Sequence, residues 1–143
     1  MIEELLGIVV SESDYSETSK ILQVLTPKYG IISVLSKGCK RLKSDLRSVS
    51  NKLTFGTFNI IYKENKLSTL VSVDVQNRFK NILNDIEKIS YASFLLELSY
   101  QVSKQNFNSL VYEFLISGLT KIDEGFDALV ITNIIELKYL DLL

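Results

Sequence analysis

Apolar and polar side chains alternate along the first eighty residues in the way that half-buried β-strands require. Between residues 57 and 62, for example, Phe58, Ile60 and Tyr62 alternate with the side chains at 57, 59 and 61. The pattern predicts five strands, which we place at Leu5–Ser11, Ser19–Thr26, Ile31–Ser36, Leu53–Lys63 and Leu67–Val75. In the fifth strand the alternation puts one set of side chains on a single face, namely Leu67, Thr69, Val71, Val73 and Val75.

Turn residues separate these strands. In TPKYG, residues 26–30, Pro27 presets φ for a turn and Gly30 also favours one, which predicts a hairpin. The polar stretch KENK, residues 63–66, joins the fourth and fifth strands. Five strands in about eighty residues, with a longer connection after the third, suit a small closed barrel such as the OB-fold.

The period changes to that of helices from residue 82 onward. Asn84, followed three residues later by Glu87, predicts a helix N-terminus with a capping box. This helix is expected to be buried on most sides, through Ile86, Ile89, Tyr91, Ser93, Leu95, Leu96, Leu98, Tyr100 and Val102. Two more helices are predicted, from about Asn108 to Ile122 and from Asp127 to the last residue. The expected fold class is α+β, with an OB-fold barrel followed by an all-helical segment.

The connection between the third and fourth strands has two edges when it is set on a helix at 100° per residue. The basic edge holds Lys40, Lys43 and Arg47. The apolar edge, which would cover one end of the barrel, comprises Leu42, Leu46, Val49 and Leu53. Gly38 and the nearby serines disfavour a helix, so a loop is equally compatible with the sequence. The basic side chains are expected to be exposed in either case.

Composition and charge add a division into two parts. Of 143 residues, 46% are apolar and 23% are charged, as in an ordinary globular protein with a real core. The net charge of −1 hides an asymmetry, since residues 1–80 carry twelve Lys and Arg against eight Asp and Glu, whereas residues 81–143 carry four against nine. This asymmetry predicts two domains with different partners, a barrel over residues 1–80 and a helical domain over residues 81–143.

Positive charge is concentrated in the stretch SKGCKRLKSDLR, residues 36–47. Five of the sixteen Lys and Arg residues lie between Lys37 and Arg47, with one acid, Asp45. Such a run is either a solvated loop or a patch that neutralises phosphates whatever the base sequence. The candidate DNA contacts are Lys37, Lys40, Arg41, Lys43 and Arg47, and Lys20, Lys52, Lys63, Lys66, Arg78 and Lys80 could extend the patch.

Two tyrosines are candidates for stacking on unpaired bases, as single-strand binders require. Tyr29 lies at the predicted hairpin tip, where it could equally serve only to close its turn. Tyr62 alternates with core residues, which favours a buried position.

The chain has no histidine and a single cysteine, Cys39. Zinc sites of nitrogen and sulfur ligands and catalysis through histidine are therefore excluded within it. Glu12, Asp14 and Glu17 lie close in sequence, but acids beside a strand end are more often turn and cap residues than metal ligands. With no phosphate loop or nucleophile elbow, we expect neither an enzyme nor a cofactor. No signal-peptide pattern or apolar span of about 20 residues occurs, which predicts a cytosolic protein.

The stretch from Asp14 to Arg47 resembles the N-terminal domain of the bacterial RecO family of DNA repair proteins. The family shows D-Y-x-E-x-x-K-I-x-x-x-L-T-x-x-x-G followed by K-G-x-R-R-x-K-S-x-L, and this chain has Lys40 in place of one arginine. The matching residues are Asp14, Tyr15, Glu17, Lys20, Ile21, Leu25, Thr26, Gly30, Lys37, Gly38, Arg41, Lys43, Ser44 and Leu46. LTFGTFNIIY, YASFLLEL and IIELKYLDLL are similar to later family segments.

The resemblance implies a non-enzymatic recombination mediator, with an OB-fold and a helical domain, that works on the nucleoid in the cytoplasm. Such proteins bind single- and double-stranded DNA, anneal strands, engage single-strand DNA-binding protein, and work with RecR to help a RecA-type recombinase onto coated DNA. The family binds DNA on the basic face of the barrel. The resemblance therefore gives this role to Lys37, Lys40, Arg41, Lys43 and Arg47, with Lys63, Lys66 and Tyr29 as weaker candidates.

The chain departs from the family at its C-terminal end. Family members usually continue into a cysteine-bearing zinc-ribbon region and further helices, and this sequence has no such cysteines. We expect either an N-terminal part of a longer protein or a shortened member, with an incomplete helical domain and without zinc. The resemblance therefore does not imply full binding of partners or full loading of the recombinase by this chain. Cys39 lies where the family often has a small residue and is expected to be a filler rather than a ligand.

A protein-interaction module without DNA binding is the competing interpretation. Three broadly apolar helices could leave a groove for a partner segment, or they could pack on one another and on the barrel. If their faces stay uncovered, the chain is expected to self-associate. The basic stretch distinguishes the two functions, because an interaction module has no need of it.

Overall fold

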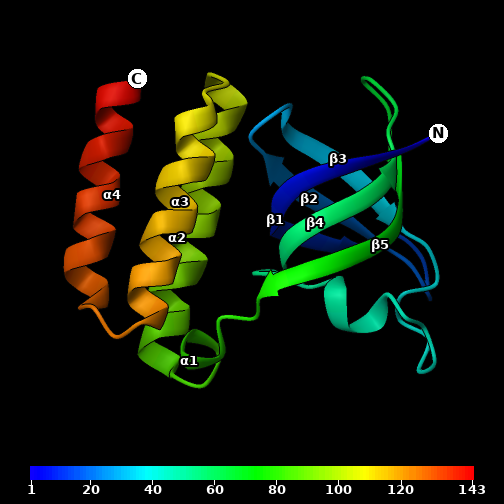
Figure 1. Cartoon of the computed structure of the whole chain (residues 1–143), viewed down its shortest axis with the longest axis horizontal. Helices are drawn as coiled ribbons and strands as arrows, with labels where there is room; N and C mark the ends of the chain where they lie inside the picture. Colours follow the sequence, from blue (N-terminus) through cyan, green and yellow to red (C-terminus); the bar gives the residue numbers. More distant parts are fainter. The chain divides into compact units, whose positions relative to one another are not determined.

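The computed structural model describes residues 1–143. The chain forms two compact units, Met1–Arg78 and Phe79–Leu143. Figure 1 shows the first, the barrel unit, as a set of curved strands and the second, the helical unit, as a set of helices.

Five strands make up the barrel unit, namely β1 (Ile2–Asp14), β2 (Lys20–Thr26), β3 (Gly30–Ser36), β4 (Phe55–Ile61) and β5 (Ser68–Asn77). Their order is β1-β2-β3-β5-β4, and β4 pairs back onto β1 to close the barrel. Neighbouring strands are antiparallel except for β3 and β5, which are parallel. The predicted five-stranded OB-fold is confirmed, including the turn between β2 and β3.

Alternating apolar side chains fill the barrel. Phe58 and Ile60 of β4 point inward as predicted and are 1% and 0% exposed. The buried cluster consists of Leu5, Val9, Leu22, Val24, Ile32, Val34, Phe58, Ile60 and Leu70. Burying one side chain of this size contributes about 1.5–3 kcal/mol, so this cluster is the main stabilising feature of the unit.

The predicted face of β5 is wrong in its first half because the strand contains a bulge. Asn59 and Ile60 of β4 pair with residues 72 and 70, which leaves Val71 without a partner across the ladder. One extra residue reverses the alternation. Leu70 therefore points into the core, and Val71 is 42% exposed instead of sharing the face of Val73.

Two glycines allow neighbouring strands to approach closely. Gly7 of β1 pairs with Gly56 of β4. A Cβ atom on Gly56 would overlap the carbonyl oxygen of Asp74 on β5, and one on Gly7 would lie 2.7 Å from a methyl carbon of Val24 on β2. Side chains at these two positions would therefore push the strands apart.

The connection between β3 and β4, residues 37–54, is a loop with one 3₁₀ turn, η1 (Arg47–Val49), and not an α-helix. Val49 and Leu53 are buried, and Leu46 packs on the barrel core, as predicted for the apolar edge. Leu42 is 84% exposed, so its predicted place on that edge is wrong. A succession of turns does not repeat every 3.6 residues, which is why Leu42 does not share a side with the others.

The helical unit consists of α1 (Lys80–Leu83), α2 (Ile86–Gln105), α3 (Ser109–Asp123) and α4 (Ala128–Leu142). In Figure 1, α2, α3 and α4 lie side by side, in agreement with their mutual contacts. The helices α3 and α4 begin as predicted, because Asn108 and Asp127 accept hydrogen bonds from the backbone N–H groups of Leu110 and Val130. No helix combines the length and apolar composition that crossing a lipid bilayer requires.

The predicted cap of α2 is displaced by one residue. Asp85, rather than Asn84, accepts a hydrogen bond from the backbone N–H of Lys88. Asn84 instead ends the short helix α1, which the pattern does not predict. Ile86, expected on the buried face, is 86% exposed in the first turn of α2.

A buried hydroxyl group joins three helices of the helical unit. The Tyr139 hydroxyl of α4 lies 2.6 Å from Ser99 Oγ of α2 and donates to the Val111 carbonyl oxygen of α3 at 3.2 Å. Burial raises the pKa of Tyr139, although the Ser99 hydrogen bond acts in the opposite direction. Burial also raises the pKa of Tyr112, to about 12. Both hydroxyl groups therefore stay protonated to a higher pH than that of an exposed tyrosine.

Candidate nucleic-acid interface

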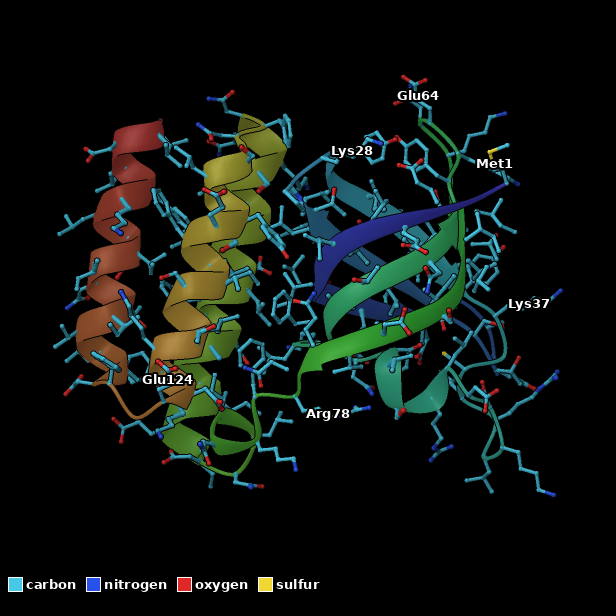
Figure 2. All side chains as sticks on the ribbon, viewed as in Figure 1. Met1, Lys28, Lys37, Glu64, Arg78 and Glu124 are labelled. Carbon is cyan, nitrogen blue, oxygen red and sulfur yellow. The ribbon has the colours of Figure 1, made fainter.

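Residues 37–47, which we call the basic loop, directly follow β3 on the surface of the barrel unit. Lys37, Arg41 and Lys43 are exposed, and their charged groups take part in no ion pair or hydrogen bond within the protein. Figure 2 shows the Lys37 side chain pointing away from the barrel. These three cations are available to an external anion.

The other two cations of the basic loop are bound within the protein. Lys40 Nζ lies 2.7 Å from Asp14 Oδ1 at the end of β1, and Arg47 Nη1 donates to the Lys40 carbonyl oxygen at 2.9 Å. The hydrogen bond and the charge of Lys40 lower the pKa of Asp14. A phosphate would have to compete with Asp14 for Lys40, so the main contribution of Lys40 is to hold the loop.

Backbone hydrogen bonds tie the basic loop to the connection between β1 and β2, residues 15–19. The Gly38 N–H donates to Ser19 Oγ, and the Lys40 N–H donates to the Thr18 carbonyl oxygen, both at 2.9 Å. Gly38 has a φ of +70°, which favours glycine. Cys39 is 2% exposed between these two anchors. An anchored loop presents its cations with little ordering cost on binding.

The weaker lysine and arginine candidates near the basic loop differ in their partners. Lys20 Nζ lies 2.7 Å from Glu12 Oε1 and also donates to the Ser50 carbonyl oxygen at 3.3 Å. Lys20 therefore holds β2 to the segment after η1 and is not available to phosphate. Lys52 has an exposed side chain without a partner, and Arg78 Nη1 donates to a backbone carbonyl oxygen at 3.4 Å. Lys52 is the better extension of the basic loop.

The three acids considered as metal ligands do not form a metal site. Glu12 and Asp14 pair with Lys20 and Lys40, and Glu17 is exposed without a partner. No group of three or more His, Cys, Asp or Glu residues lies close enough together to hold a metal ion. The carboxylates of Glu12 and Asp14 therefore stabilise the barrel unit, whereas that of Glu17 makes no such contact.

A hollow of about 570 Å³ opens between the basic loop and the connection at residues 15–19. Its lining includes Tyr15, Leu35, Lys37 and Arg41. Tyr15 is 59% exposed, and sequence reasoning did not single it out as a contact. The sequence feature that could have identified Tyr15 is its position as an aromatic residue in a polar turn, where the core does not require one. Leu35 is an outward side chain of β3, so the hollow reaches onto that strand.

The remaining candidates, Tyr29, Lys63 and Lys66, lie at the opposite end of β3. Tyr29 directly precedes that strand, whereas the basic loop directly follows it. The parallel pairing of β3 with β5 brings the turn at residues 62–67 beside the start of β3. Figure 2 shows their neighbours Lys28 and Glu64 toward one end of the barrel and Lys37 farther along it. The candidate residues therefore form two groups rather than one patch.

The second group contains an aromatic pair. The rings of Tyr29 and Tyr62 are stacked, with centroids 4.2 Å apart and planes 6° from parallel. Tyr62, which the alternation favours as buried, is only partly buried, and this burial raises its pKa. The position of Tyr62 at the end of β4, where the strand leaves the barrel, explains the difference.

Two family models match the chain in succession. The family described as "Recombination protein O N terminal" matches residues 1–79, and the family described as "Recombination protein O C terminal" matches residues 83–143. The first match alone covers more than half of the chain.

Curated relatives carry the name DNA repair protein RecO. The one from Listeria welshimeri is 34% identical over 143 residues, which cover 99% of this chain and 56% of that protein. The one from Halalkalibacterium halodurans is 32% identical over 139 residues, or 96% of this chain and 54% of that protein. The one from Bacillus cytotoxicus is 34% identical over 144 residues, or 100% and 58%. The chain thus spans about half the length of the curated relatives it matches.

Proposed function

The chain belongs to the RecO family of DNA repair proteins, and we propose that it serves DNA repair and recombination by binding the DNA backbone through the basic loop. The observation that carries this proposal is the group of three exposed, unpaired cations, Lys37, Arg41 and Lys43, on a loop that is already anchored. Unpaired cations can neutralise phosphates without first breaking an internal ion pair.

The proposed contacts are to phosphates and not to base edges. No helix or ribbon of the barrel unit carries the basic residues in a form that enters a groove, since the basic loop consists of turns. We therefore expect little dependence on base sequence and a strong dependence on salt. Lys40 and Arg47 support the loop geometry, and Lys52 extends the cationic surface.

Finer activities follow from the family alone and remain predictions. They are annealing of complementary strands and help to a RecA-type recombinase on coated DNA, together with single-strand DNA-binding protein and RecR. None of these steps requires a catalytic residue of this chain.

The proposal is tested by measuring binding of a labelled single-stranded oligonucleotide across a salt series. The chain is compared with a K37A/R41A/K43A variant, which removes the unpaired cations but keeps the contacts of Lys40 and Arg47. Each phosphate contact adds about 0.7 to the slope of log K against log salt for single strands, so the slope should fall by about 2. The control is K88A/K104A/K121A, with the same charge change in the helical unit and no expected change in slope.

Two results would count against this function. Equal slopes for the variant and the wild type would remove the basic loop from the interface. No binding by the folded wild type at low salt would favour the alternative, in which this chain is a protein-interaction module.

That second candidate rests on the apolar surface of α4. Leu137 and Leu140 are each 65% exposed, and exposed apolar side chains on one helix are typical of surfaces that contact protein. The expected self-association of the chain would use this surface. This surface does not involve the basic loop, so the alternative function needs no DNA binding by the chain.

A further inference from the structure

The Tyr29–Tyr62 pair lies in a hollow at the end of β3 that is remote from the basic loop. The hollow has a volume of about 420 Å³, and its lining includes Tyr29, Tyr62, Ile31, Lys63 and Lys66. Stacked aromatic rings flanked by lysines are the combination with which single-strand binders hold a base and its phosphate.

The aromatic pair is fixed before any ligand arrives. The Tyr29 hydroxyl donates to Glu3 Oε2 at 2.8 Å, and the Tyr29 N–H donates to Thr26 Oγ1 at 2.9 Å. Lys28 Nζ lies 2.9 Å from the same Glu3 carboxylate, and its hydrogen bond, followed by that of Tyr29, lowers the pKa of Glu3. Both rings also pack against the barrel core. A base that stacks here meets a rigid surface, which reduces the entropic cost of binding.

The Tyr62 ring is the member of the pair better placed to receive a base. The Tyr29 ring is already covered by Lys28, whose Nζ lies 5.1 Å from the ring centroid. Tyr62 is followed directly by the turn that carries Lys63 and Lys66, both exposed and without ion-pair partners. A base stacked on Tyr62 would therefore have its phosphate near two available cations.

The outer face of β3 connects this hollow with the basic loop. Ile31 and Ser33 line the hollow at the tyrosine end, and Leu35 lines the hollow at the basic loop. The four residue-to-residue steps of strand from Ile31 to Leu35 span about 13 Å. A short single strand can cover this distance, in keeping with the small site size of one OB-fold, about 4–16 nucleotides. Gln23 of β2 and Ser33 are hydrogen-bonded at 2.9 Å and put polar groups between the two hollows.

We propose that the Tyr29–Tyr62 pair is a stacking platform for an unpaired nucleobase, at the end of a single-strand path that runs along β3 from the basic loop. This inference rests on the proposed DNA-binding function and adds a preference for single strands, which phosphate contacts alone do not give. Bases in a duplex are stacked on one another and cannot reach the Tyr62 ring. The platform therefore selects single strands over duplex, while the basic loop serves both.

The test compares three DNA probes on the full chain: a normal single strand, a single strand of the same length made of abasic residues, and a duplex. Stacking on an aromatic side chain is worth roughly 5- to 150-fold in affinity per base. The wild type should prefer the normal strand to the abasic strand by a factor in that range. A Y62L variant should lose this preference and keep the wild-type salt slope and duplex affinity, whereas Y62F should behave as the wild type.

The control is Y100L in the helical unit, where Tyr100 has a lysine ammonium over its ring at 4.9 Å, as Tyr29 of the platform does. This variant should bind all three probes as the wild type does. The chain has seven tyrosines and no tryptophan, so quenching of tyrosine fluorescence by the normal strand, and not by the abasic strand, is a second readout. It requires no variant and remains informative if Y62L fails to fold.

The outcomes separate this inference from the function on which it rests. Equal affinity of the wild type for normal and abasic strands overturns the platform, even if the basic loop controls the salt slope. A folded Y62L variant that weakens single-strand and duplex binding equally also overturns it, because Tyr62 would then give no preference for unpaired bases. Failure of the wild type to bind any probe overturns the platform together with the proposed function.

Discussion

The barrel unit and the helical unit use their charged side chains in different ways. All three ion pairs of the chain lie in the barrel unit, and they join Lys20 to Glu12, Lys28 to Glu3 and Lys40 to Asp14. The Lys28 and Lys40 pairs hold a turn and a loop to β1, and the Lys20 pair joins β2 to β1. In the helical unit the lysines with a specific contact lie over aromatic rings, namely Lys104 over Tyr100 and Lys138 over Phe114. Helix caps and apolar packing stabilise this second unit.

This difference shows how to separate structural cations from available ones. The total number of basic residues marks the barrel unit as the candidate DNA binder, but several of those residues are occupied by carboxylates. Lys37, Arg41 and Lys43 remain available, whereas Lys20 and Lys40 do not. The helical unit is acidic and exposes apolar side chains on α4, which suits contacts with protein better than contacts with phosphate.

The largest predicted effect is a difference between two glycine substitutions, one in each unit. Gly56→Ala should destabilise the barrel unit by about 3 kcal/mol or more, because the new Cβ would overlap the backbone oxygen of Asp74. Gly118→Ala should stay within about 1 kcal/mol of wild type. Its Cβ would meet a side-chain carbon of Ile135 at 3.0 Å, and alanine favours the helix more than glycine does. Chemical denaturation of each variant measures both effects.

A matched readout connects this pair of substitutions to the proposed interface. Gly56→Ala should also abolish DNA binding, whereas Gly118→Ala should leave it unchanged. If the two substitutions destabilised the chain equally, the strands of the barrel would have more freedom to separate than the pairing at Gly7 and Gly56 indicates.

A second prediction concerns the pH at which each unit loses stability. Burial raises the pKa of Tyr112 to about 12. Its contribution to stability is complete below the pKa of an unfolded tyrosine, about 10, and is lost as pH rises toward 12. The loss should be about 1.4 kcal/mol per pH unit in that window. The burial-raised pKa of Tyr139 acts in the same direction.

The barrel unit should show the opposite dependence. The pKa values of Asp14 and Glu3 are lowered by Lys40 and Lys28, respectively. The stability from these pairs is present above the unfolded carboxyl pKa values and is lost as pH falls through the lowered folded values. Amide-resolved NMR at acid and alkaline pH would assign each loss to a unit. Y112F should flatten the alkaline limb, and Y15F, at an exposed position, should not; equal slopes for the two would contradict the prediction.

Sequence reasoning succeeded where the determining signal is local. Alternation defined the five strands, and Asn108 and Asp127 marked the starts of α3 and α4, because a cap and its helix lie within a few residues of each other. Sequence reasoning failed at Val71, because a bulge residue without a partner can be recognised only when the pairing with the neighbouring strand is known. It also failed at Leu42, because a series of turns has no fixed period.

The candidate interface shows the same limit. The basic stretch is visible in the sequence, but the sequence does not show which of its cations pair with carboxylates. The partner of Lys40 is Asp14, at the end of β1, and the partner of Tyr29 is Tyr62, directly after β4. Closure of the barrel creates both contacts. Sequence alone therefore located the charge correctly and could not divide it into structural and available cations.

The smallest predicted effect tests that division directly, through the Asp14–Lys40 pair. Asp14→Asn removes the carboxylate charge but keeps a side-chain oxygen that can accept the hydrogen bond from Lys40. The Lys40 N–H bond to Thr18 is unaffected, so the basic loop should keep its position. Lys40 then becomes available to phosphate. We expect single-strand affinity to rise by roughly 2- to 5-fold and the salt slope to steepen by up to about 0.7, measured in the same salt series.

Glu17→Gln is the matched control for this gain. It removes the same charge from the neighbouring connection between β1 and β2, where Glu17 is exposed and pairs with no cation. Long-range electrostatics alone would raise affinity in both variants to a similar extent. A larger gain for Asp14→Asn, with a steeper slope, would show that an ion pair within the barrel unit limits its contacts with DNA. Equal gains would mean that Lys40 already contacts phosphate in the wild type. The ion pair with Asp14 would then not limit DNA binding by Lys40.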